Sequence, residues 1–409
     1  MGLDSREVTP ALVQRIVYAA AETRSFERGS VVLEQVGGNQ ISASTVARVT
    51  QQVGLELAAL RDQEQPAETS KLEPISSRLV QSPEVAPELA VVECDGGRIR
   101  TREAGQGRGV HGEAWRETKN ACLLRMTHKT FEADPEPELP RAFRDPQRVA
   151  NLAEKEAPPA LPPELPTSPP SQGEPASDEP PWRPRRMVRT CLSSMAEADT
   201  FGQQMRREAR QRRFFEAAFR AFLGDGLPWN WSIWKRYFAD FIPILDFIHA
   251  LHYVYAAALA MESQFSVAWS RYLKMARDCW QGRVAEVVSE LKQWLVEHGL
   301  PEGMELPEKD PRQAVADAAR YLSNNQGRMD YPRYRRLGLP VTSALMESLV
   351  KEVNYRVKGT EMFWNDPRGA EAILQVRAAA LCDDDRLARY LRTRTGCPYV
   401  RRSSLAQVA

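Results

Sequence analysis

The chain has 409 residues, too many for one ordinary domain, and its hydrophobic share of 43% is enough to form two or three cores. No apolar run approaches the roughly eighteen residues of a membrane helix, and the start "MGLDSREVTP" lacks the regions of a signal peptide, so we expect a cytoplasmic protein with no membrane partner. The six Cys are scattered without a CxxC pair, which argues against a structural zinc site.

The net charge of +1 gives no indication of a nucleic-acid partner, but the charge is unevenly distributed. Residues 183–213 hold nine Arg against three acids, residues 386–402 hold six Arg and no acid, and residues 327–338 interleave Arg with two Tyr. Any one of these stretches is typical of a solvated helix face. The three together favour contacts with the phosphates of nucleic acid.

Residues 8–60 repeat apolar residues at helical spacing in two runs, with the Gly-rich turn "GGNQ" between them. Ser42 or Ser44 can cap the second helix. Two helices joined by such a turn are typical of a helix-turn-helix DNA reader, and equally of a plain helical hairpin. We therefore predict an N-terminal helical region over residues 1–60, followed by a polar, Pro-containing linker over residues 61–87.

Residues 88–126 are rich in β-forming residues. Within "ELAVVECDGGRIRTRE", we expect the first strand to end at Asp95, the two glycines to turn the chain, and "RIRTRE" to form a second strand. Residues 115–126 are predicted to be the third strand of this meander.

Residues 156–184 contain eleven of the 29 prolines and are expected to be an extended, disordered insertion. A helix over about residues 194–212 follows, then a strand-like run before Asp225, a short helix, and the short strand "IPILDF". A helical block and a last helix complete the chain. This order predicts an α/β fold with a mixed five-stranded sheet and helices inserted into it.

Three acids occupy places where such a fold can bring them together: Asp95 and Asp225 end strands, and Glu347 begins a late helix. Converging carboxylates suit Mg²⁺ or Mn²⁺, and two such ions can activate an attacking oxygen and stabilise the leaving oxygen of a phosphodiester. Taken singly, each acid also has a structural explanation. Asp95 and Asp225 precede glycine in turns, and Glu347 is favourable at a helix N-terminus.

Three blocks of the sequence resemble the catalytic blocks of DDE transposases from bacterial insertion sequences, in particular the ISKra-type family, which is related to the Mutator and hAT transposases. "VVECDGGRIRTRE" with "GVHGEAWRETKNACLL" is similar to the first block, "FLGDGLPWNWSIWKRYFADFIPILDFIHALHYV" to the second, and "YRRLGLPVTSALMESLVKEVNYRVKGTEMFW" to the third. The blocks stand in the family's order and cover most of residues 88–385. Where relatives often read "GSG" before "ES", this chain has "VTSALMES".

The resemblance implies an RNase H-like fold in which Asp95, Asp225 and Glu347 are the catalytic triad and hold two Mg²⁺ (or Mn²⁺) ions. It also implies that Asp246 and His249, in "ILDFIHA", form the family's accessory D-x-x-H motif. His249 would orient Asp246 or bind a phosphate, or be an ordinary structural His. From the sequence alone, Asp246 can exchange roles with Asp225.

The resemblance also divides the chain. It implies a catalytic core over residues 88–261, an inserted helical domain over residues 262–338, and a return to the core over residues 339–385. Residues 386–409 then remain as a basic C-terminal tail.

Four basic residues are predicted to contact DNA. Lys351 and Lys358 lie four and eleven residues after Glu347, roughly on its face of the helix, and Arg335 and Arg336 belong to the stretch that interleaves Arg with Tyr. For the two lysines, a solvent-facing position without a DNA contact is the alternative.

These observations predict a transposase that binds the terminal repeats of its element, cleaves DNA and joins the 3′-ends to target DNA. It would act at the nucleoid, as a homo-oligomer in the synaptic complex. Two alternatives remain open: an RNase H-like nuclease without strand transfer, and a catalytically inactive DNA-binding derivative that acts as a repressor.

Overall fold

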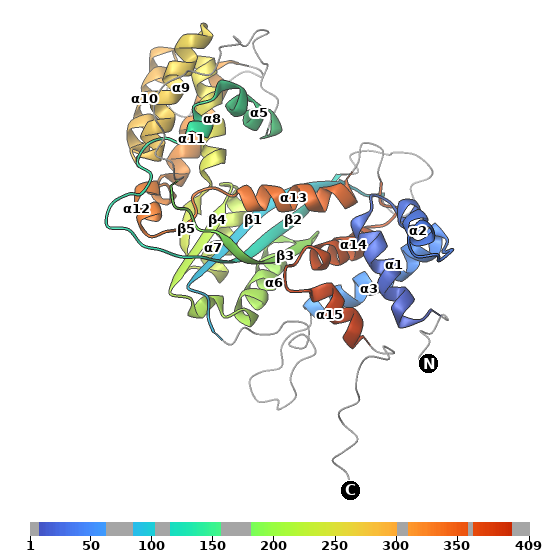
Figure 1. The fold of residues 1–409 in the computed structure, drawn as a ribbon. Coiled ribbons are helices and arrows are strands. Elements are labelled where there is room, and N and C mark those ends of the chain that lie inside the picture. The colour runs from blue at the N-terminus through green and yellow to red at the C-terminus, as the bar shows by residue number, and fades with distance from the viewer. Residues whose placement is uncertain are drawn as a thin grey trace.

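The computed structural model describes residues 8–62, 85–102, 115–156, 181–300, 310–358 and 363–394. A five-stranded sheet with the strand order β3-β2-β1-β4-β5 lies at its centre (Figure 1). The strands are β1 (Leu89–Arg100), β2 (Trp115–Met126), β3 (Arg186–Ser194), β4 (Phe219–Gly224) and β5 (Ile242–Leu245). β1, β2 and β3 are antiparallel neighbours, whereas β4 and β5 run parallel to β1. This mixed sheet with flanking helices confirms the predicted α/β class and fits an RNase H-like core.

The helices cover the sheet and extend beyond it. In chain order, those of the described ranges are α1 (Pro10–Glu22), α2 (Phe26–Gln35), α3 (Ala43–Asp62), α5 (Pro146–Glu156), α6 (Ala198–Gln211), α7 (Pro228–Tyr237), α8 (Phe247–Met261), α9 (Phe265–Trp280), α10 (Val284–Glu297), α11 (Arg312–Asn325), α12 (Tyr331–Arg336), α13 (Ala344–Val357), α14 (Pro367–Ala380) and α15 (Arg386–Thr393). Short 3₁₀ turns occur at η1 (Arg141–Phe143), η2 (Phe214–Glu216) and η3 (Gln326–Arg328).

The Asp-Gly-Gly segment is not a hairpin turn, so that prediction was wrong. Asp95 and the two glycines after it continue β1 and pair with β2. Gly97 is needed for close packing instead, because a Cβ there would lie 2.7 Å from Oγ1 of Thr118. The predicted first and second strands are therefore one strand, β1, and the predicted third strand is β2. Their connection, residues 103–114, lies outside the described residues.

Strand β3 was not predicted from the sequence. Its segment "RMVRTCLSS" includes Arg189, an unusual residue for a buried strand position. The structure buries Arg189 against Glu352 of α13, with Nη1–Oε1 and Nη2–Oε2 distances of 2.9 and 3.0 Å. A partner that distant in the chain gives no local signal. Most of the predicted disordered insertion, residues 157–180, lies outside the described residues.

The two faces of β1 meet different helices. Val92 and Cys94 belong to the core that includes residues of α6 and α7. Val91 lies on the other face, in the core that includes residues of α8 and α13. Since side chains alternate along a strand, Asp95 shares the face of Val91 and points toward the layer that contains α13.

A bundle of helices stands at one end of the sheet, formed by α8, α9, α10 and α11 with α5 beside them (Figure 1). Phe247, at the start of α8, packs against α9 and α12 by edge-to-face contacts with Trp280 and Tyr331, at ring-centroid distances of 4.7 and 5.1 Å. α9 to α12 fall in the segment between α8 and α13 where a helical insertion was predicted. Residues 301–309 of that segment lie outside the described residues.

The N-terminal region contains three helices, where two were predicted. The first predicted helix breaks after α1, where the side chain of Ser25 accepts a hydrogen bond from the backbone N–H of Arg28 and starts α2. Ser42, one of the two predicted caps, accepts the N–H of Thr45 at the start of α3. Residues 1–7 and most of the predicted linker, residues 63–84, lie outside the described residues.

The N-terminal helices share one apolar core with α14 and α15. Leu33 and Val53 belong to the same cluster as Val376 and Leu387. The first part of the predicted basic tail is therefore a packed helix, α15. Residues 395–409 lie outside the described residues.

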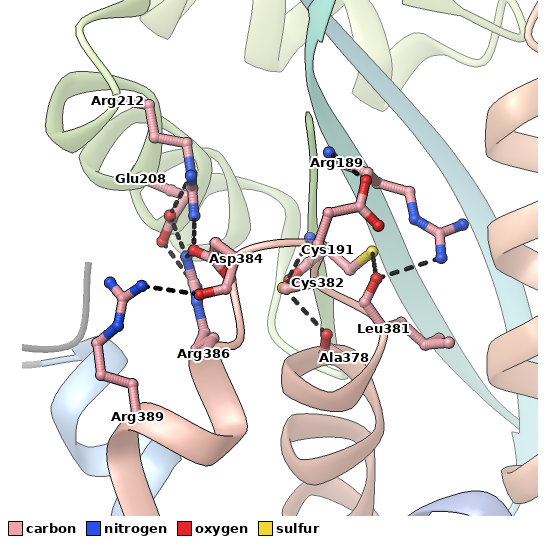
Figure 2. Close-up of polar contacts among 11 residues, drawn as sticks. Arg189, Cys191, Glu208, Arg212, Ala378, Leu381, Cys382, Asp384, Arg386 and Arg389 are labelled. Atoms are coloured by element: carbon pink, nitrogen blue, oxygen red, sulfur yellow. Dashed lines mark hydrogen bonds and ion pairs between the residues drawn. The ribbon is translucent and has the colours of Figure 1, made fainter. Parts of the chain in front are cut away.

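The connection between α14 and α15 is fixed to α6 and β3 by polar contacts (Figure 2). Glu208 of α6 pairs with Arg212 over 2.9 Å and with Arg386 of α15 over 3.0 Å. On the β3 side, the backbone N–H of Cys191 donates to Sγ of Cys382 over 3.2 Å. The C-terminal helices are thus held to both the sheet and the helix that covers it.

Candidate functional site

Asp95 and Asp225 are placed side by side by the pairing of β1 with β4. The two strands are parallel, and Cys94 of β1 lies opposite Gly224 of β4. The next residue on each strand is an aspartate, and both side chains are partly exposed. Burial, with the added charges of Asp225 and Asp95, raises the pKa of the Cys94 thiol well above its usual range. Both carboxylates therefore lie close to this thiol.

The chain around Asp225 is held by α7 and α11. Oδ1 of Asp225 accepts hydrogen bonds from the N–H of Leu227, at 2.8 Å, and from the side chain of Asn230. The backbone carbonyl of Asp225 accepts the hydroxyl of Tyr321 over 2.6 Å. Gly226 has φ +94°, and a Cβ there would lie 2.6 Å from the ring of Tyr321. The turn therefore requires glycine at position 226, and these contacts fix the position of the Asp225 carboxylate.

Asp246 lies at the same level of the next strand, since Gly224 pairs with Leu245, but its carboxylate is used differently. It is 0% exposed, and Oδ2 is 2.6 Å from Nδ1 of His249. Oδ1 accepts the N–H of Ser343 over 3.0 Å, and Oδ2 accepts the Ser343 hydroxyl over 2.7 Å. Burial would raise the pKa of Asp246, but His249 and Ser343 outweigh it and hold that pKa below its usual value. His249 is therefore in direct contact with Asp246.

Glu347 lies in the first turn of α13, which packs across β1 and β2. Its backbone N–H donates to the carbonyl of Ser343 over 3.0 Å. Its carboxylate is 3.4 Å from Nζ of Lys351. Glu347 also lines a cavity of about 530 Å³ whose wall includes Glu93 of β1.

Glu93 is a candidate that the sequence reasoning missed. It is 1% exposed and precedes Asp95 by two residues, so it lies on the same face of β1. Its Oε2 has no hydrogen-bond partner. Burial and the charge of Asp246 raise the pKa of Glu93 to about 8, against a hydrogen bond from the backbone of Met346. The sequence did contain a signal for Glu93. In "VVECD" two acids stand two residues apart, a spacing that places both on one face of a strand.

The four predicted DNA contacts differ in their surroundings. Lys351 and Lys358 are exposed, and Nζ of Lys358 is 5.7 Å from the ring centroid of Trp115. Arg336 is also exposed.

Arg335 is 5% exposed, so its prediction as a DNA contact is corrected. Its Nε donates to Asp134 over 2.8 Å, its Nη2 donates to the carbonyl of Trp280 over 3.0 Å, and the guanidinium lies 4.0 Å from the centroid of the Trp280 ring. Arg335 fastens α12 to α9 and to the segment before α5.

Across the described ranges, no group of three or more His, Cys, Asp or Glu side chains is arranged as a set of metal ligands. The donors that the sequence nominated are all carboxylates, and Glu93 adds a buried carboxylate oxygen without a hydrogen bond on the face of Asp95. Hard oxygen donors of this kind match Mg²⁺ or Mn²⁺ in chemistry.

No helix in the described parts of the chain combines the length and apolar character needed to cross a membrane.

Comparison with protein-family models finds no family that matches this chain, and comparison with curated proteins finds no relative. Among solved structures, one similar chain comes from the "Drosophila P element transposase strand transfer complex". The two share 9% sequence identity with a TM-score of 0.36, and the alignment covers 91% of this chain and 92% of that chain. At this TM-score the likeness does not establish a common fold, so the proposals below depend on this chain's own residues.

Proposed function

We propose that this protein is a DDE-type transposase, which binds the ends of its element, cleaves DNA there and joins the 3′-ends to a target. The observation that carries the proposal is the register of β1 and β4, which brings Asp95 and Asp225 next to each other where the pairing of these two strands ends. Glu347 comes from α13, the helix that covers β1 and β2. The three sequence blocks predict that Glu347 joins the two aspartates from this helix.

Asp95, Asp225 and Glu347 are the residues that would hold two Mg²⁺ or Mn²⁺ ions. Bound there, such ions activate the attacking oxygen and stabilise the leaving oxygen of a phosphodiester. The protein's own part is to hold the three carboxylates in place. Asp225 is favoured over Asp246 as the second member, because Asp246 is fully buried and its two oxygens already accept four hydrogen bonds.

DNA would contact the surface around these acids. Lys351 and Lys358 are exposed on the side of Glu347 and can meet phosphates, and Arg336 lies exposed at the end of α12. α9 to α12 would form the helical domain inserted between the second Asp and the Glu. As with other enzymes that join two DNA ends, we expect a homo-oligomer in the synaptic complex.

The N-terminal helices would recognise the terminal repeats. Ser44 and Arg48 are exposed in the first turns of α3, the part of a recognition helix that reaches base edges, whereas Val53 and Leu57 pack inward. This is the helix-turn-helix reading of residues 8–60. A plain bundle that only supports the core is the other reading, and Arg48→Ala distinguishes them by its effect on binding to the element ends.

The test uses DNA that carries the terminal sequences flanking the gene. Wild-type protein in Mg²⁺ should cut at the ends and join pre-cut ends to a target plasmid. Asp95→Asn and Glu347→Gln should lower both reactions by at least about 100-fold, because each removes a charged metal ligand. Binding to the same DNA in EDTA should not change. Glu286→Gln, an exposed acid on α10, is the matched control and should react as wild type.

Three results would contradict the proposal in different ways. Full cleavage by Asp95→Asn in Mg²⁺ would remove the site assignment. Cleavage without any joining of pre-cut ends would identify a nuclease. Specific binding to the element ends without any cleavage by wild-type protein, in either Mg²⁺ or Mn²⁺, would identify a DNA-binding repressor.

A further inference from the structure

The first turn of α13 is held by two carboxylates that belong to other elements. The backbone N–H of Ser343 donates to Oδ1 of Asp246, which follows β5, and its hydroxyl donates to Oδ2 of the same side chain. The backbone of Met346 hydrogen-bonds Glu93 of β1. Both acids are almost completely buried, at 0% and 1% exposed.

This arrangement replaces the usual N-terminal cap of a helix. The first N–H groups of a helix have no partner within the helix, and a serine at the start normally accepts one of them with its own side chain. Ser343 precedes α13 but makes no such capping hydrogen bond. Its hydroxyl is directed to Asp246 instead, and the negative charge of Asp246 complements the positive N-terminus of the helix. Glu93 contributes a hydrogen bond with the backbone of Met346.

Glu347 lies within the turn that these contacts fix. It follows Met346 directly, and its own N–H donates to the carbonyl of Ser343 over 3.0 Å. Asp246 is in turn held to the strand that precedes Asp225, because its backbone N–H donates to the carbonyl of Gly224 over 3.0 Å. One continuous set of hydrogen bonds therefore runs from the C-terminal end of β4 to α13, the helix that carries Glu347.

We propose that Asp246, Ser343 and Glu93 are positioning residues, which set Glu347 against Asp95 and Asp225. The inference rests on the proposed function and assigns roles to Ser343 and Glu93 that the sequence did not suggest. An error of about 1 Å in the placement of a reacting group can lower a rate about 100-fold, so a rigid attachment at this turn has a direct chemical consequence.

Two pairs of variants of the full-length protein test the inference. Ser343→Ala removes the hydroxyl that reaches Asp246, and Ser343→Thr keeps it. Glu93→Met removes the acceptor for Met346 while keeping the side chain's length, and Glu93→Gln keeps an acceptor oxygen. Each protein is titrated with Mn²⁺ by calorimetry, and DNA cleavage is measured as a function of Mg²⁺ concentration. Melting temperature and DNA binding in EDTA report on the fold.

Ser343→Ala and Glu93→Met should bind Mn²⁺ about tenfold more weakly and need correspondingly more Mg²⁺, as is typical for the partners of metal ligands. Their DNA binding in EDTA should match wild type, and the Thr and Gln variants should recover most of the Mn²⁺ affinity.

Wild-type Mn²⁺ affinity in Ser343→Ala would overturn the inference and leave the proposed function standing. Loss of affinity in Glu93→Gln as severe as in Glu93→Met would make Glu93 a ligand and overturn its positioning role. Wild-type protein that neither binds Mn²⁺ nor cleaves would overturn the proposed function itself.

Discussion

Nε of Arg356, near the end of α13, donates to the backbone carbonyl of Ala20 in α1 over 2.7 Å. Arg356 is 1% exposed, and its guanidinium also lies 4.5 Å from the ring centroid of Phe26. A neighbouring buried cation, Arg377 of α14, donates to the carbonyl of Ala21. The last carbonyls of a helix have no partner within it and favour a positive charge nearby. The helix that carries Glu347 is therefore attached at its far end to the N-terminal helices.

Replacing Arg356 by Met should destabilise the protein without touching the candidate site. The change leaves the carbonyl of Ala20 without its charged donor, which should lower the free energy of unfolding by about 3 kcal/mol. Urea denaturation followed by circular dichroism measures this loss of stability. Arg333→Met, at an exposed position of α12, is the matched control and should unfold with the wild-type midpoint. Equal midpoints for both variants would show that the contact between α13 and α1 contributes little.

Gly54 of α3 should not tolerate a methyl group. A Cβ there would collide with the backbone carbonyl of Ala372 in α14, so Gly54→Ala must force the two helices apart. In an open helix this substitution stabilises by up to about 1 kcal/mol, but here the overpacking should lower the free energy of unfolding by about 2 kcal/mol. A thermal melt detects the fall as several degrees. Gly327→Ala, where a Cβ meets nothing within 4 Å, is the control. A melt no lower than that of the control would mean that α3 and α14 are not tightly packed.

The α/β class, strands β4 and β5 and the helix that carries Glu347 could be predicted from the sequence, because short apolar runs and helical periodicity are local signals. β3 could not, since Arg189 in its middle is compatible with a strand only through Glu352, which lies far along the chain. The extent of β1 was misjudged for a related reason. Asp-Gly-Gly is a turn signal, and only the pairing with β2 overrides it.

The sequence indicates Asp95, Asp225 and Glu347 as candidates but gives no sign of the contacts that surround them. Glu93 shows why: its spacing from Asp95 is visible in the sequence, but its burial depends on α13 covering that face. Arg335 shows the opposite error. A basic stretch predicts an exposed surface, and the pairing of Arg335 with Asp134, which turns it inward, depends on the tertiary fold.

Asp225→Asn and Asp246→Asn should separate the two aspartates that the sequence could not distinguish. Asn at 225 keeps an oxygen for the N–H of Leu227, so the melting temperature should stay at the wild-type value while DNA cleavage is lost. Asn at 246 removes the charge opposite His249 and spoils a buried network, which should cost about 2 kcal/mol of stability. Thermal melts and cleavage assays on both proteins provide the comparison. An Asp225→Asn protein that cleaves normally, with the loss of activity confined to Asp246→Asn, would exchange the two assignments.

Glu208 should make the protein sensitive to acid through the contacts drawn in Figure 2. Burial alone would raise the pKa of this carboxyl, but the charges of Arg386 and Arg212, and hydrogen bonds from both, hold it at about 2, with Asp384 as the neighbouring acid. Because the folded pKa lies below the unfolded value of 4.5, the carboxylate contributes its full stabilisation above pH 4.5 and loses it as the pH falls toward 2. Between pH 6 and pH 2 this group alone should account for about 3 kcal/mol of lost stability. Urea denaturation at a series of pH values, on the wild type and on Glu208→Gln, measures the contribution of Glu208. The variant should be less stable than wild type at pH 6 and should lose less stability on acidification. Parallel pH profiles for the two proteins would show that Glu208 titrates normally and that Arg212 and Arg386 do not hold its charge.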